Sequence, residues 1–154
     1  METTKKLASL GSLLACLVGP SVSIADNCSG EDVLVAQSAE TIEVAKGHSL
    51  TVVRLFSVVT SGDTPIFDAT TGECSGTWLT TPDGKTRGAG HCARRDKDGD
   101  TYSIEWSMAP GADKGQWRVA GGTGKFANKA NSGWFQQAVA DGKMSVTKWG
   151  GNCK

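Results

Sequence analysis

Apolar and polar residues alternate in short segments along the chain, and no stretch beyond the N-terminal segment keeps a helical period. A period of two is typical of strands that bury one face. Counting gives about eight strands, enough for an antiparallel sheet to close into a barrel. Nine segments match the pattern, the first two of them short: residues 32–37, 41–45, 49–59, 73–80, 86–95, 100–108, 115–120, 133–140 and 143–149.

Turn chemistry separates several of these segments. Residues 82–85 (PDGK) combine a proline that sets φ with a glycine that tolerates positive φ. Asp98-Gly99 is a strong signal for a two-residue type I′ hairpin turn. Further turns are predicted at residues 110–113 and 141–142. The pattern therefore predicts one all-β domain, a single eight-stranded antiparallel barrel.

The N-terminal segment predicts export. A basic pair precedes an apolar run at residues 7–19, and the small residues Ser23 and Ala25 stand where a signal peptidase reads. The run is shorter than the roughly 20 residues that a membrane-spanning helix needs. We therefore expect a signal peptide at residues 1–25, a barrel domain at 26–154, and a periplasmic or secreted protein.

A lipoprotein signal is the alternative. Residues 13–16 resemble a lipobox that ends at Cys16. Leu17 and Val18 continue the apolar run past this cysteine, however, where a lipid-anchored chain usually turns polar. We expect soluble export, and contact with a membrane only if Cys16 is lipidated.

Charge and spacing exclude several classes of ligand. The chain has 16 basic and 16 acidic residues, so it has no long-range field that would attract nucleic acid. Residues 96–100 look like the start of an EF-hand loop, but Thr101 replaces the required glycine and Ser107 the bidentate glutamate. We expect a solvated turn there, and neither a metal nor a cofactor in the protein.

Four cysteines remain in the predicted mature domain, and an even number in an exported domain predicts disulfides, with three possible pairings. A zinc site is not favoured because no CxxC spacing occurs. If Asp83-Gly84 centres its turn, Cys74 and Cys92 lie nearly opposite each other on paired strands. Cys28 and Cys153 are then left to join the two ends of the domain.

The strongest candidate chemistry lies on one predicted hairpin. A two-residue turn at Asp98-Gly99 would place His91 opposite Trp106, and the next hairpin would bring Trp117 near Trp106. An aromatic face with one histidine suits a lumen for an apolar or aromatic ligand, although the rings could equally fill the barrel. The ligand-binding candidates are His91, Tyr102, Trp106 and Trp117, with Ile104 on the same face and Cys92, Ser103 and Glu105 on the other.

The segment 121–127, Gly-Gly-Thr-Gly-Lys-Phe-Ala, with Gly133 beyond it, resembles a segment of the allene oxide cyclase and dirigent-protein barrels. Residues 92–106 are similar to small exported bacterial relatives of that superfamily. The resemblance implies an eight-stranded calycin-like barrel. The glycines permit a sharp corner, after which Phe126 can turn inward and plug the barrel end.

Three functions are compatible with this resemblance, because members include cyclases, guides of radical coupling and proteins without known activity. We expect a barrel that binds a small apolar or aromatic molecule in its lumen. The first alternative is a cofactor-independent cyclase or isomerase that uses the same cavity. The second is a filled barrel with a structural or protein-interaction role. The cyclase catalytic residues lie outside the matching segment, so no catalytic residue is assigned.

Overall fold

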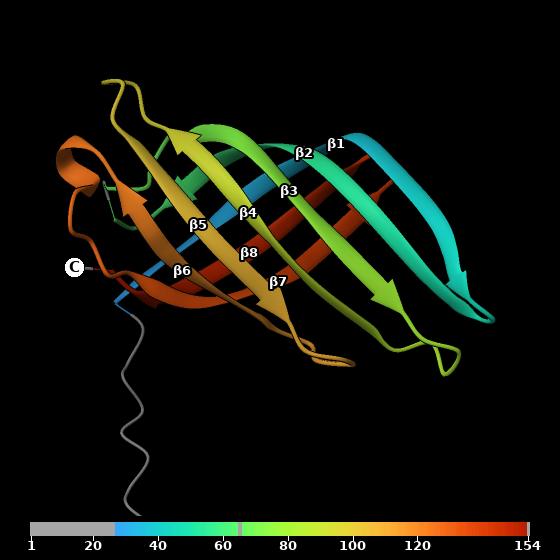
Figure 1. The fold of residues 1–154 in the computed structure, drawn as a ribbon. Helices are drawn as coiled ribbons and strands as arrows, with labels where there is room; N and C mark the ends of the chain where they lie inside the picture. Colours follow the sequence, from blue (N-terminus) through green and yellow to red (C-terminus); the bar gives the residue numbers. More distant parts are fainter. Residues whose placement is uncertain (1–26, 65, 154) are drawn as a thin grey trace, which may run out of the picture.

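The computed structural model describes residues 27–64 and 66–153 and is a closed antiparallel barrel in which each strand pairs with the next and β8 pairs with β1 (Figure 1). The predicted all-β barrel of eight strands is confirmed. The strands are β1 (Cys28–Ala45), β2 (His48–Gly62), β3 (Thr71–Thr80), β4 (Thr86–Arg95), β5 (Thr101–Met108), β6 (Gly115–Gly122), β7 (Ser132–Asp141) and β8 (Met144–Asn152).

The predicted signal peptide lies outside the described residues and stays a prediction. Within the described residues, no helix is long and apolar enough to cross a membrane. The two N-terminal strands predicted at 32–37 and 41–45 form the single strand β1, because a register shift between Ala36 and Ser38 keeps the ladder with β2 continuous.

The two ends of the barrel differ in their connections. At one end, which we call the turn end, the turns after β1, β3, β5 and β7 each contain a glycine with positive φ. The opposite end, which we call the plugged end, holds the other three connections and the termini of the described chain (Figure 1). The connection between β6 and β7 at this end contains the short helix η1 (Gly124–Phe126). The glycines at the turn end are Gly47, Gly84, Gly111 and Gly142.

Aromatic rings close the plugged end. Phe126 is fully buried, and its ring centroid lies 4.4 Å from that of Tyr102. Phe67, from the β2–β3 connection, packs its ring 5.2 Å from Tyr102 and 5.9 Å from Trp149. These edge and tilted contacts are the arrangements that aromatic pairs prefer. The prediction that Phe126 plugs the barrel end is confirmed.

Both predicted disulfides are present. Cys74 and Cys92 are direct partners in the ladder between β3 and β4, and Cys28 is joined to Cys153 beside the ladder between β1 and β8. The second bond therefore joins the strands at which the barrel closes. Two disulfides in a small domain fit an oxidising compartment.

The connection between β4 and β5 differs from the predicted two-residue turn. The backbone N–H of Asp96 donates to the carbonyl of Asp100 (3.0 Å), and Gly99 adopts φ +90°. The carboxylate of Asp96 accepts the backbone N–H groups of Asp98 and Asp100, both at 2.9 Å. This is a longer loop with a glycine in the left-handed region, and it shifts the strand register by one residue.

Candidate ligand-binding lumen

The barrel encloses a cavity of about 510 Å³, within the range of small-molecule sites. Its lining is mostly apolar and aromatic and is contributed by all strands as well as the β2–β3 connection. The lining residues are Asp32, Leu34, Val53, Leu55, Val59, Phe67, Cys74, Trp78, Thr86, Cys92, Arg94, Tyr102, Ile104, Trp106, Met108, Trp117, Phe135, Gln137, Ser145, Thr147 and Trp149.

The ring of Trp106 lies against the inner surface of the barrel, where two glycines leave room for it. A Cβ atom on Gly76 would lie 2.3 Å from the ring, and one on Gly90 would lie 2.5 Å from it. The ring centroid of Trp78 is 5.2 Å from that of Trp106, and Phe135 meets Trp106 edge-on at 6.2 Å. The result is an aromatic wall whose rings also face the cavity.

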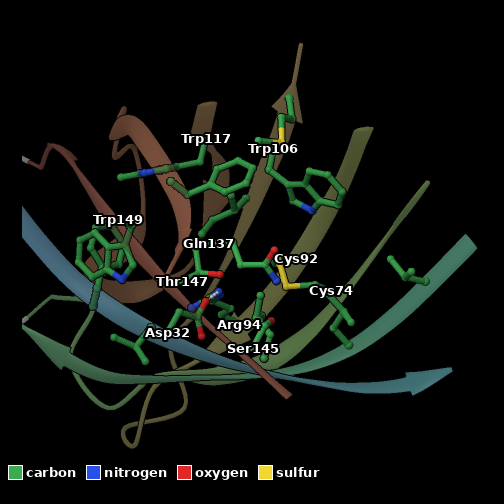
Figure 2. Close-up of a pocket in the computed structure, with 18 of the residues that line it drawn as sticks. Asp32, Cys74, Cys92, Arg94, Trp106, Trp117, Gln137, Ser145, Thr147 and Trp149 are labelled. Atoms are coloured by element: carbon green, nitrogen blue, oxygen red, sulfur yellow. Dashed lines mark hydrogen bonds and ion pairs between the residues drawn. A yellow bond between two sulfur atoms is a disulfide. The ribbon is translucent and has the colours of Figure 1, made fainter. Parts of the chain in front are cut away.

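An ion pair between β1 and β4 lies deeper in the lining, toward the plugged end. Arg94 on β4 donates from Nη2 to the carboxylate of Asp32 on β1, and both side chains are buried. Ser57 donates to the same carboxylate at 2.9 Å. Thr147 and Gln137 belong to the same row of the sheet, because the ladder pairs Asp32 with Thr147 and Thr147 with Gln137. Figure 2 shows Asp32, Arg94, Thr147 and Gln137, which we call the polar cluster, below Trp117 and Trp106 in this view.

The electrostatics of the cluster keep Arg94 charged. Burial alone would lower the pKa of Arg94, but the Asp32 carboxylate and the Tyr102 hydroxyl together outweigh burial, and the pKa is raised. Burial raises the pKa of Tyr102, whose hydroxyl lies 2.8 Å from that of Thr70. Among the described residues, no acceptor bonds to Nε of Arg94. The cluster therefore has more donor capacity than its own acceptors use.

Access to the cavity is from the turn end. Lining side chains near the plugged end, such as Phe67, Tyr102 and Trp149, are buried. Lining side chains nearer the turns, such as Trp78 and Met108, are partly exposed. The lumen is thus closed at one end by aromatic rings and reaches solvent at the other.

The structure brings together three of the four predicted binding residues. Tyr102, Trp106 and Trp117 all line the cavity, and Trp106 is the ladder partner of Trp117 as predicted. The predicted place of His91 is wrong: it pairs with Glu105 and is exposed on the outer face.

The longer β4–β5 loop explains this error. It moves every β4 residue one place along β5, and a shift by one residue exchanges the two faces of a strand. The predicted outward position of Cys92 is therefore also wrong, since Cys92 is the partner of Ile104 and lines the cavity.

Sequence reasoning missed Asp32 and Arg94 because they lie 62 residues apart, on strands that do not pair with each other. The sequence did contain a signal that the side chain of Arg94 points into the barrel. Arg94 stands two residues after Cys92, and a disulfide-bonded cysteine on a strand is normally buried, so alternation would also turn Arg94 inward.

Comparison with known proteins supports the fold. The chain is similar to the structure of a pterocarpan synthase dirigent protein, with a TM-score of 0.51 and 12% identity over 84% of this chain and 85% of that one. The barrel is dirigent-like. No protein-family profile matches the sequence, and no curated protein matches it. At this identity the similarity concerns the fold alone.

Proposed function

We propose that the barrel binds a small apolar or aromatic molecule in its lumen, with an oxygen of that molecule accepting a hydrogen bond at the polar cluster. The observation that carries the proposal is a cavity of about 510 Å³ with the rings of Trp78 and Trp106 toward the turn end and the Asp32–Arg94 pair toward the plugged end. A ligand with an apolar body and one acceptor group matches both parts of this lining.

A matched pair of probes tests this proposal: 2-naphthoic acid and 2-methylnaphthalene, which differ in the carboxylate. Calorimetric titration of the disulfide-bonded protein should show saturable binding of both. The acid should bind about tenfold more tightly, since a charge-assisted hydrogen bond contributes roughly 1.5–3 kcal/mol. Arg94→Lys keeps a positive charge beside Asp32 but loses the guanidinium fork, so it should weaken the acid more than the hydrocarbon.

The variant Trp106→Ala tests the apolar part of the proposed site with the same two probes. Removal of the ring should weaken both probes by roughly 1–2 kcal/mol, because it removes apolar contact area that they share. The matched control is His91→Ala, which removes an exposed side chain of the outer face and should leave both affinities unchanged. Failure of the wild-type protein to bind either probe saturably would count against lumen binding.

A cofactor-independent cyclase or isomerase that uses the same cavity is the second candidate. The buried carboxylate of Asp32 favours it, because a carboxylate in the lining can accept or orient a proton of a bound molecule. The similar dirigent protein is itself described as a synthase. Conversion of a bound molecule, followed by mass spectrometry, distinguishes this candidate from simple binding.

A further inference from the structure

The barrel leaves one long strand edge without a partner among the described residues. β1 pairs with β8 only from Cys28 to Val35, with one further bond from Ala36 to the carbonyl of Lys143. Beyond that point β1 continues to Ala45 and pairs with β2 alone. Figure 1 shows β1 and β2 extending well past the ends of β7 and β8. We call residues 38–45 the free edge.

The free edge is exposed on both faces. Every residue from Gln37 to Ala45 is exposed to solvent. The segment also alternates, with Ile42 and Val44 on the outer face, 48% and 50% exposed. An exposed edge of this length offers a row of backbone donors and acceptors to another strand, and it lacks the proline or lysine that commonly blocks such pairing.

Exposed apolar side chains also occur on the outside of the barrel, on the strands next to the free edge. Within the described residues, all seven large hydrophobic side chains that are exposed lie on β1, β2, β7 and β8. They lie on the outer face. Four of them directly follow or precede a residue that lines the lumen, and the ladder extends the same alternation to the rest, since Ile42 pairs with Leu50 and Val139 with Val146. We call this set the apolar face: Val35, Ile42, Val44, Val52, Phe56, Val139 and Met144.

The outer wall on the other side of the barrel has a different character. The outward residues of β4, β5 and β6 are small, polar or charged, and Arg118 forms an ion pair there with Glu105. Exposed hydrophobic side chains are thus concentrated on one side of the molecule, the distribution expected of an interaction surface.

We propose that this surface binds a second copy of the same chain, with the two free edges pairing antiparallel about a two-fold axis. Edge pairing continues the sheet from one copy into the other, so the contact consists of the paired backbone of the free edge and the outward side chains beside it, Ile42, Val44 and Val52. An isologous contact places the same patch on both sides, so apolar residues meet apolar residues.

The charges of the free edge are compatible with this pairing. A register centred on Ile42 places Ile42 opposite Ile42 of the second copy and Glu40 opposite Val44. Neither Glu40 nor Glu43 then faces a like charge. The chain as a whole has equal numbers of acidic and basic residues, so no net charge opposes association.

Sedimentation velocity of the disulfide-bonded protein tests the proposal. The wild-type protein should sediment as a dimer at micromolar concentration. The double variant Ile42→Lys/Val44→Lys should raise the dissociation constant at least tenfold, because lysine on an edge blocks strand pairing. The matched control Ala93→Lys/Ser107→Lys adds the same charge to the opposite outer wall and should leave the dimer unchanged.

A cross-linking measurement covers the case in which the lysine variant fails to fold. Ile42→Cys should form an intermolecular disulfide under mild oxidation, seen as a dimer on a non-reducing gel, whereas Ser107→Cys should not. A wild-type protein that sediments as a monomer overturns the proposal, whether or not it binds lipid vesicles or another protein. A dimer that persists in the lysine variant and gives no Ile42→Cys cross-link also overturns it.

Discussion

The plugged end and the turn end of the barrel are made from similar aromatic residues, but the rings pack differently. At the plugged end Phe67, Tyr102 and Phe126 are buried against one another. Toward the turn end, Trp78 and Trp106 contact each other yet stay partly exposed to the lumen. The difference indicates that the first group supports the fold, whereas the second leaves the cavity open toward the turn end.

The two disulfides extend the comparison and give the largest expected effect. Cys28–Cys153 lies at the plugged end, whereas Cys74 and Cys92 line the lumen. Replacing Cys28 and Cys153 by alanine should lower the free energy of unfolding by about 5 kcal/mol, since the bond closes a long loop. Replacing Cys74 and Cys92 should cost about 3 kcal/mol, because the 18-residue separation constrains the unfolded chain less. Urea unfolding of both variants measures the two losses in the free energy of unfolding. A larger loss for the Cys74–Cys92 variant would contradict the expectation that the bond at the plugged end contributes more.

The aromatic rings provide the next test. Phe126→Ala should destabilise the protein by roughly 3–5 kcal/mol, because it opens a cavity in a closed cluster. Trp78→Ala should cost roughly half as much, since its ring is already partly in contact with solvent. The expected contrast is a fold defect in the first variant and a binding defect in the second. Equal losses of stability would show that the lumen rings are ordinary core.

The smallest expected effect concerns an ion pair that fastens η1 to the β4–β5 loop. Nζ of Lys125 lies 2.5 Å from the carboxylate of Asp96. The hydrogen bond from Lys125 lowers the pKa of Asp96 below its ordinary 3.8, and the same bond raises the pKa of Lys125. The carboxylate therefore contributes to stability above pH 3.8 and loses that contribution as the pH falls through the lowered pKa.

Lys125→Met should accordingly shift the onset of acid unfolding to higher pH, as followed by tryptophan emission. Lys97→Met is the matched control. It removes the same charge from the β4–β5 loop, where the ion pair of Lys97 within the described residues is with the exposed carboxylate of Asp98 and not with Asp96. If the two variants gave the same acid profile, η1 would not be held by this ion pair.

The fold was predictable from local patterns, whereas the polar part of the lumen was not. Alternation and turn residues predicted the bounds of β4 and the pairing of Cys74 with Cys92, because a hairpin register depends on few neighbouring residues. The Asp32–Arg94 pair depends instead on the closure of the whole barrel, which brings β1 and β4 to opposite sides of one cavity.

A single loop accounts for the misplaced histidine. Asp98-Gly99 is a valid turn signal, but the carboxylate of Asp96 also accepts two backbone N–H groups and so stabilises a longer connection. Side-chain capping of this kind competes with the turn that the dipeptide alone favours. A register predicted from one dipeptide is therefore open to a one-residue error, which is sufficient to move His91 out of the lumen.

The ladder between β1 and β8 has a consequence for the order of folding. Its pairs, such as Ser29 with Gly150, join residues more than a hundred positions apart, whereas the hairpins of the barrel join near neighbours. Contacts between distant residues form slowly because a long loop must close first. We expect the hairpins and the Cys74–Cys92 bond to form early, and the sheet to stay open until the last strand is available. A truncated chain that lacks β8 would keep both edges of the sheet exposed and would be prone to aggregate.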